Sequence, residues 1–131
     1  MEQQVLKLLD EWNAAVQSGE PERVVALYAP DAMLLPTVSN QIRRNHGEML
    51  DYFKDFLALG PAAELVEYNA REFGDLLIHS GVYAFAFARP MNGITRVTAR
   101  FTFVFERRDG RWLIIEHHSS RMPEDDVAGA A

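Results

Sequence analysis

The 131-residue chain contains no cysteine, which excludes disulfide bonds and thiolate metal sites. Long apolar runs are missing as well, and the first residues, Met1 to Val5, lack the basic start and apolar core of a signal peptide. We therefore expect a soluble, cytoplasmic protein that does not bind a membrane.

Clustered positive charge is also scarce. The chain has 13 Lys and Arg against 19 Asp and Glu, a formal net charge of −6, and its arginines form only short pairs at Arg43-Arg44 and Arg107-Arg108. Such a chain repels phosphate backbones, so no nucleic-acid partner is expected. Glycine-rich phosphate loops, nucleophile elbows and metal signatures do not occur, so the sequence predicts no cofactor and no metal site and leaves enzymatic activity open.

What the chain does have is enough apolar sequence for one compact domain, because 48% of its residues are hydrophobic. We place this domain at residues 1–122 and expect a flexible C-terminal tail over 123–131. Apolar residues recur at helical spacing from Val5 to Val16, from Val24 to Tyr28 and from Met49 to Leu57. Asn45, with Glu48 three residues later, is the predicted N-cap of the third helix.

Strand signals occupy most of the remaining sequence. A short strand is predicted over 32–36, and four longer strands follow the third helix over 64–73, 76–88, 94–107 and 111–119. Helices at the front and a meander at the back favour an α+β fold. In this fold, three N-terminal helices pack on one face of a curved antiparallel β-sheet.

The turn at Asp109-Gly110 decides which side chains of the last hairpin share a face. A two-residue turn sets Phe101 and Phe103 beside His118, whereas a three-residue loop sets them beside His117. We choose three-residue loops here and at 91–93. They gather one aromatic face beneath the helices, made of Tyr83, Phe85, Phe87, Phe101, Phe103 and Phe105.

The opposite face then mixes apolar and polar side chains, which is typical of a subunit interface. We expect a homo-oligomer, a dimer at least, that associates through this face. The predicted interface residues are Arg100, Thr102, Val104, Ile114, Glu116 and His118. The alternative for His118 and its neighbours is a solvated strand face.

The aromatic face predicts a pocket for a small, mostly apolar ligand between the third helix and the sheet. Its predicted lining is Trp12, Tyr52, Tyr83, Phe103, His117 and Ser119, and Asn40 and Arg43 are the candidates for the pocket mouth. His117 has two interpretations: a group that moves protons or holds a polar ligand, or a core histidine hydrogen-bonded to a tyrosine or a backbone carbonyl.

The stretch Arg107-Arg108-Asp109-Gly110-Arg111-Trp112, with His118, Ser120 and Pro123 at fixed spacing, carries a resemblance to a known family. It resembles the closing hairpin of the calcium/calmodulin-dependent protein kinase II association domain, which belongs to the nuclear transport factor 2 (cystatin-like) superfamily. The order of elements resembles this family over essentially the whole chain.

The resemblance implies a cone-shaped fold and a sheet-to-sheet dimer, which can extend to a ring of dimers. It also implies an anion site formed by arginines in the cone. At those positions this sequence has Tyr83, Phe103 and Ser119, so a neutral or weakly polar ligand is expected instead. As a free-standing domain, the chain resembles the bacterial members of the superfamily more closely.

Three functions follow from these patterns. The leading one is a self-associating domain with a small-ligand pocket. The alternative is a small pocket enzyme, such as an isomerase or dehydratase, that uses His117 or Tyr83 as an acid or base. The third is a partner-binding adaptor, which requires a groove that stays exposed after the homodimer has formed.

Overall fold

The structure, a computed structural model, describes residues 1–124. Its elements follow the predicted order of two helices, a strand, a third helix and four strands: α1 (Glu2–Gln17), α2 (Pro21–Val25), β1 (Tyr28–Leu35), α3 (His46–Leu57), β2 (Pro61–Phe73), β3 (Leu76–Met91), β4 (Ile94–Arg108) and β5 (Arg111–Arg121). From residue 125 onward, the predicted tail lies outside the described residues.

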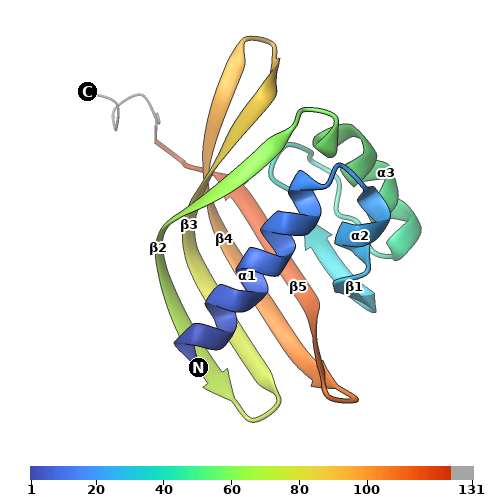
Figure 1. The fold of residues 1–131 in the computed structure, drawn as a ribbon, viewed down its shortest axis with the longest axis vertical. Coiled ribbons are helices and arrows are strands. Elements are labelled where there is room, and N and C mark those ends of the chain that lie inside the picture. The colour runs from blue at the N-terminus through green and yellow to red at the C-terminus, as the bar shows by residue number, and fades with distance from the viewer. Residues whose placement is uncertain (125–131) are drawn as a thin grey trace.

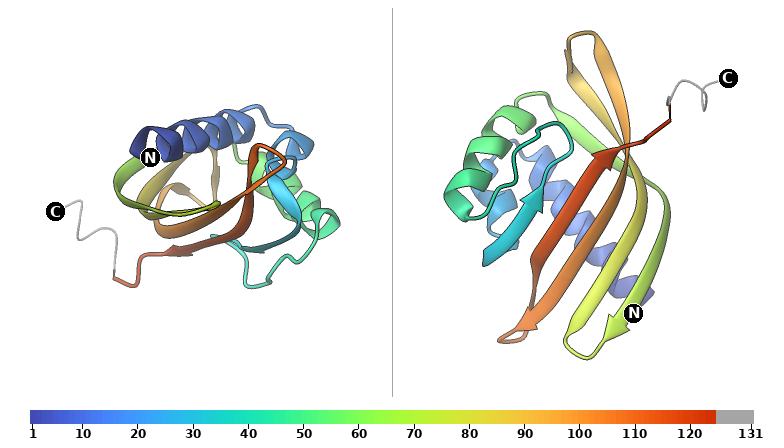
Figure 2. Two further views of the ribbon diagram at one scale, coloured as in Figure 1. Left: turned by 90° about the horizontal axis from the view of Figure 1, so that it is seen from below. Right: turned by 180° about the vertical axis from the view of Figure 1, so that it is seen from behind.

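The five strands form one curved sheet in the order β1-β5-β4-β3-β2. Neighbouring strands are antiparallel except β1 and β5, which run parallel. All three helices lie on the same side of the sheet (Figure 1), and within residues 1–124 no helix covers the other side (Figure 2). The predicted α+β architecture is confirmed.

Local sequence explains where the helices lie. α1 buries a stripe of Val5, Leu9, Trp12, Ala15 and Val16. The Asn45 side chain accepts a hydrogen bond from the Glu48 backbone N–H at 2.9 Å, so this residue is the N-cap of α3, as predicted. Among the described residues, no helix is long and apolar enough to cross a membrane.

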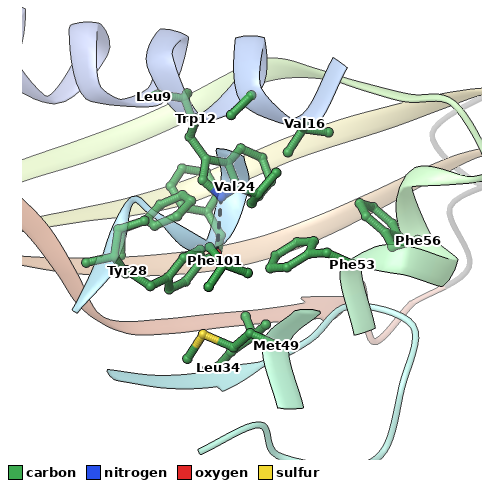
Figure 3. Packing of buried hydrophobic residues seen from close by; sticks show 14 of the residues in the cluster. Leu9, Trp12, Val16, Val24, Tyr28, Leu34, Met49, Phe53, Phe56 and Phe101 are labelled. Atoms are coloured by element: carbon green, nitrogen blue, oxygen red, sulfur yellow. Dashed lines mark hydrogen bonds between the residues drawn. The ribbon is translucent and has the colours of Figure 1, made fainter. Parts of the chain in front are cut away.

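The core lies between the helices and the inner face of the sheet (Figure 3). Each of the six aromatic side chains expected there is at least 94% buried, which confirms the predicted aromatic face. One prediction at the edge of this core was wrong. Tyr28, expected on the second helix, begins β1 and points its buried ring into the core.

The predicted three-residue loops were also wrong. Arg108 pairs with Arg111, so Asp109 and Gly110 form a two-residue turn with positive φ angles of 51° and 77°. Asn92 and Gly93 form the same kind of turn, with φ angles of 49° and 80°. Turns of this kind match the right-handed twist of paired strands, which explains the preference for Asp-Gly and Asn-Gly.

The extra residue that reverses the faces of the last hairpin lies inside β5 instead of in the turn. Phe105 pairs with Ile114 and Val104 pairs with Glu116, so Ile115 is the additional residue of a β-bulge. Beyond the bulge, Phe103 pairs with His117 as predicted. Between the bulge and the turn, the side chains of β5 point to the opposite face from the predicted one. Ile114 therefore points into the core with 1% of its surface exposed.

Candidate functional site

Polar side chains from four elements and a loop converge on one small cavity of about 10 Å³ inside the core. It is lined by Trp12, Leu34, Pro36, Thr37, Tyr52, Phe53, Tyr83, His117 and Ser119. His117 and Ser119 form the floor of the cavity, because they are two residues apart on β5 and therefore share a face of the sheet. Helices α1 and α3 supply the aromatic walls, Trp12 and Tyr52.

His117 is the centre of a buried hydrogen-bond network. Its Nδ1 lies 2.7 Å from the hydroxyl of Tyr28, which also accepts a hydrogen bond from Trp12 Nε1 at 3.1 Å, the dashed line in Figure 3. Its Nε2 lies 3.1 Å from the hydroxyl of Tyr83. The Phe103 ring stacks on the imidazole with 3.9 Å between ring centroids. Both ring nitrogens thus have hydrogen-bond partners, and stacking on Phe103 fixes the plane of the ring.

The network continues toward the surface through two small hydroxyl side chains. Tyr83 donates to Ser119 Oγ at 2.7 Å, and Ser119 Oγ lies 2.5 Å from Thr37 Oγ1. Because the Tyr83 hydroxyl donates its hydrogen bond to Ser119, it accepts one from His117, so Nε2 carries the hydrogen. His117 Nδ1 then accepts a hydrogen bond from the Tyr28 hydroxyl. One neutral tautomer of His117 satisfies the whole chain of hydrogen bonds.

Burial holds the ionisable members of this network in their neutral forms. Desolvation, with a smaller contribution from the neighbouring His118, lowers the pKa of His117 to about 3. Desolvation also raises the pKa values of Tyr28, Tyr52 and Tyr83 above their ordinary value of 10. Near neutral pH, none of these groups is charged.

The cavity has room for about one water molecule, whose own requirement is roughly 10–15 Å³. Five of the six predicted pocket residues line it, and the sixth, Phe103, lies against His117. The residue types expected at a ligand site are therefore assembled, but the space between them is nearly filled. Of the two interpretations of His117, this geometry matches the core histidine held by tyrosines.

The two candidates for the pocket mouth lie on the loop between β1 and α3. The Arg43 guanidinium lies over the Tyr52 ring, 5.3 Å from its centroid. Asn40 lines a separate surface groove beside the end of β5. Sequence reasoning missed Thr37, which closes the network. It considered Tyr28 for the rim of a cavity but favoured core packing, and it did not predict the hydrogen bond between Tyr28 and His117.

A second buried histidine, His79 on β3, was also missed. It is fully buried against Tyr68, Phe101 and Phe103, and neither ring nitrogen has a hydrogen-bond partner among the described residues. Burial lowers its pKa to about 4. A signal existed, because His79 has the same strand parity as Tyr83 and therefore belongs to the inner face.

The outer sheet face presents four aligned rows of side chains across the strands, described here from β2 or β3 toward β5 or β1. The rows are Phe73, Leu76, Glu106, Leu113; Ile78, Val104, Glu116, Met33; Ser80, Thr102, His118, Leu35; and Val82, Arg100, Ser120. Five of the six predicted interface residues lie in these rows. Ile114 does not, since the bulge turns it inward. Phe73, which sequence reasoning did not place here, is 57% exposed.

Comparison with known proteins first defines the class. The structure is similar to an uncharacterised protein with a cystatin-like fold from Caulobacter vibrioides, with 21% identity, coverage of 95% of this chain and 92% of that one, and a TM-score of 0.74. It is similar to a nuclear transport factor 2-like protein of unknown function from Pseudomonas putida, with 19% identity, coverage of 95% and 87%, and a TM-score of 0.78. The chain therefore has the cone-shaped fold that is called nuclear transport factor 2-like or cystatin-like.

Two further comparisons identify the family within this fold class. A family model described as the calcium/calmodulin dependent protein kinase II association domain matches residues 1–123. A crystal structure from Xanthomonas campestris, described as an association domain of this kind, shares 46% identity, covers 93% of this chain and 88% of that one, and has a TM-score of 0.88. No curated protein matches the chain. The chain belongs to the calcium/calmodulin dependent protein kinase II association domain family.

Proposed function

We propose that the protein is a self-associating domain whose copies pair through the outer sheet face. The observation that carries this proposal is the composition of the four rows. Phe73, Leu76, Ile78, Val82, Val104, Leu113, Met33 and Leu35 supply apolar surface on a face that no helix covers within residues 1–124. A face that mixes apolar and polar side chains in this way is typical of a subunit interface, and membership of an association-domain family supports a second copy as the partner.

Charge supports pairing of identical faces. Arg100 and Glu116 are exposed on this face and have opposite signs. In a twofold interface, residue i of one copy meets residue j of the other and the reverse contact occurs as well. In the proposed arrangement the two faces are antiparallel, each Arg100 lies toward the partner copy's glutamate, and the apolar side chains of the rows pack together.

Sedimentation tests the proposal. The parent is expected to sediment as a dimer or a larger species at micromolar concentration, and Val104→Glu is expected to sediment as a monomer. Val104 is half-buried on the outer side, so the new carboxylate stays solvated in a monomer but not between two sheets. Ala14→Glu, which adds the same charge on the exposed side of α1, is the matched control and should keep the parent mass.

The charge pair offers a second arm. Arg100→Glu and Glu116→Arg should each weaken association, and the double variant should restore part of it. A parent that is monomeric at tens of micromolar contradicts self-association. A Val104→Glu variant with the parent mass shows that the copies pair through another surface.

The cavity supports ligand binding and catalysis less well. A small apolar ligand requires the walls around His117 to move apart, because only about 10 Å³ is open. Acid or base chemistry at His117 requires a ring nitrogen within reach of a substrate, and both nitrogens of His117 are bonded to buried tyrosines. The buried network therefore supports a structural role that stiffens the sheet on which association depends.

A further inference from the structure

The surface groove at the mouth of the core is a separate feature from the buried cavity. It has a volume of about 350 Å³, at the lower end of the range for small-molecule sites. Because β1 and β5 run parallel, the loop that follows β1 and the final residues of β5 meet at the same end of the sheet (Figure 2). The groove lies between them.

Neutral hydrogen-bonding groups dominate the groove. The loop contributes the hydroxyls of Thr37 and Ser39 and the amides of Asn40 and Gln41, and β5 contributes the hydroxyls of Ser119 and Ser120. Hydroxyl and amide side chains can both donate and accept hydrogen bonds. Ser39 Oγ already accepts from Arg43 and from the Gln41 N–H, and Ser119 Oγ already accepts from Tyr83. Within the described part of the chain, no carboxylate lines the groove, and its basic side chains are His118 and Arg121.

The floor of the groove is tied to the buried core. Pro36, Thr37 and Ser119 line both the groove and the inner cavity, so these side chains lie between the two spaces. Ser119 is 98% buried, and its Oγ accepts a hydrogen bond from the Tyr83 hydroxyl. A hydroxyl group of an occupant could therefore bond to a side chain whose orientation the core already fixes, which lowers the entropy cost of binding.

The loop wall is fixed as well. Leu34 and Arg43 exchange two backbone hydrogen bonds of 2.8 and 2.9 Å and close the loop at its base. The Arg43 side chain then holds the loop from within, since Nη1 donates to Ser39 Oγ at 3.1 Å and to the Gln41 carbonyl at 2.5 Å. Stacking on Tyr52 anchors this arginine to α3. Arg43 is thus a positioning residue for the groove.

We infer that this groove binds a small neutral polyhydroxylated molecule, a polyol or a monosaccharide. Paired donors and acceptors on both walls match vicinal hydroxyl groups, and Leu35, Pro36 and Ile42 offer apolar surface for the carbon skeleton. Six neutral groups against two basic ones favour a neutral ligand over an anion. Binding does not require self-association, although Leu35, His118 and Ser120 belong to both the groove and the outer sheet face.

The test is a titration followed by backbone amide NMR, with glycerol, myo-inositol and glucose as neutral probes and gluconate as the anionic probe. At least one neutral probe is expected to shift the amides of residues 37–42 and 118–121 saturably, with a Kd in the millimolar range or tighter. Asn40→Ala, at an exposed position, should weaken that binding about fivefold or more, since a hydrogen bond is lost. Asn69→Ala, which removes an exposed amide on β2, is the control and should leave binding unchanged.

Three outcomes overturn the inference: no saturable shift with any neutral probe up to 100 mM, gluconate binding at least tenfold tighter than glucose, or equal affinity in the parent and Asn40→Ala. The Val104→Glu variant separates this inference from the proposed function. Polyol binding that persists in monomeric Val104→Glu shows a groove site that is independent of assembly, and failure of polyol binding leaves the sedimentation result untouched.

Discussion

Two histidines flank Phe103 on the inner face of the sheet, and the protein holds them in opposite ways. His79 pairs with Phe103 from β3 and His117 pairs with it from β5. Both are at least 98% buried. His117 has a hydroxyl partner on each ring nitrogen, whereas His79 has aromatic neighbours and no hydrogen-bond partner among the described residues.

The difference teaches what a buried imidazole contributes. Where its nitrogens are bonded, it orders its neighbours, and His117 fixes two tyrosines, which in turn orient Trp12 and Ser119. Where they are not bonded, the ring mainly fills volume at the cost of its lost hydration. The two sites share one physical response, since burial lowers both pKa values.

The largest expected effect comes from removing the wall between the two sites. Phe103→Ala should lower the free energy of unfolding by about 3–5 kcal/mol, because it leaves a cavity beside both histidines. Urea unfolding followed by tryptophan fluorescence measures the change. Phe103→Leu keeps part of the volume and should lose less. Equal losses in the two variants would show that contacts of the aromatic ring, and not packing volume, hold the two histidines in place.

Acid should destabilise the protein through both histidines. Their folded-state pKa values of about 4 and about 3 lie below the ordinary value of 6.5, so the unfolded state binds protons first as pH falls. The histidine contribution to stability is present in full above about pH 6.5 and declines toward pH 4, by about 1.4 kcal/mol per pH unit for each histidine.

Unfolding free energies measured between pH 7 and pH 4.5 check this dependence. Carboxylates also titrate at the acid end, so the informative quantity is the difference between the parent and His79→Leu. That variant should show a shallower decline below pH 6.5. An unchanged slope would mean that His79 keeps an ordinary pKa in the folded protein.

Replacing each histidine by leucine separates the two sites directly. His117→Leu removes hydrogen bonds to Tyr28 and Tyr83 and leaves buried hydroxyls without partners, so it should cost about 2–4 kcal/mol at pH 7. His79→Leu removes no hydrogen bond that residues 1–124 form with its ring, and it should be neutral or stabilising. Comparable losses at the two positions would indicate that His79 has a partner such as a buried water.

The sequence predicted the order of elements and the aromatic inner face, because alternation along β3 and β4 is regular and strand parity is a local property. It predicted the wrong turns because a bulge at Ile115 and a longer loop reverse the faces equally well, and only packing decides between them. Ile114 moved from the predicted interface to the core for this reason.

The residues of the candidate site were also predictable, since Tyr83, His117 and Ser119 follow from parity once the faces are assigned. The volume between them was not, because it depends on how closely Tyr28, Tyr52 and Phe53 approach the sheet. The parallel pairing of β1 with β5, which brings the loop carrying Thr37 over Ser119, has no signal in the sequence of either strand.

The smallest expected changes in stability come from removing the hydroxyl of the tyrosine beside each histidine, Tyr28 beside His117 and Tyr68 beside His79. Tyr28→Phe deprives Trp12 Nε1 and His117 Nδ1 of a buried partner and should cost about 1–2 kcal/mol. Tyr68 packs edge-on against His79, and its hydroxyl donates to exposed Glu2 at the surface. Tyr68→Phe should therefore change stability by less than about 0.5 kcal/mol, because water replaces that contact. Thermal unfolding of both variants at pH 7 provides the measurement. If Tyr68→Phe were the more damaging, the link between the N-terminal turn of α1 and β2 would matter more to stability than the network around His117.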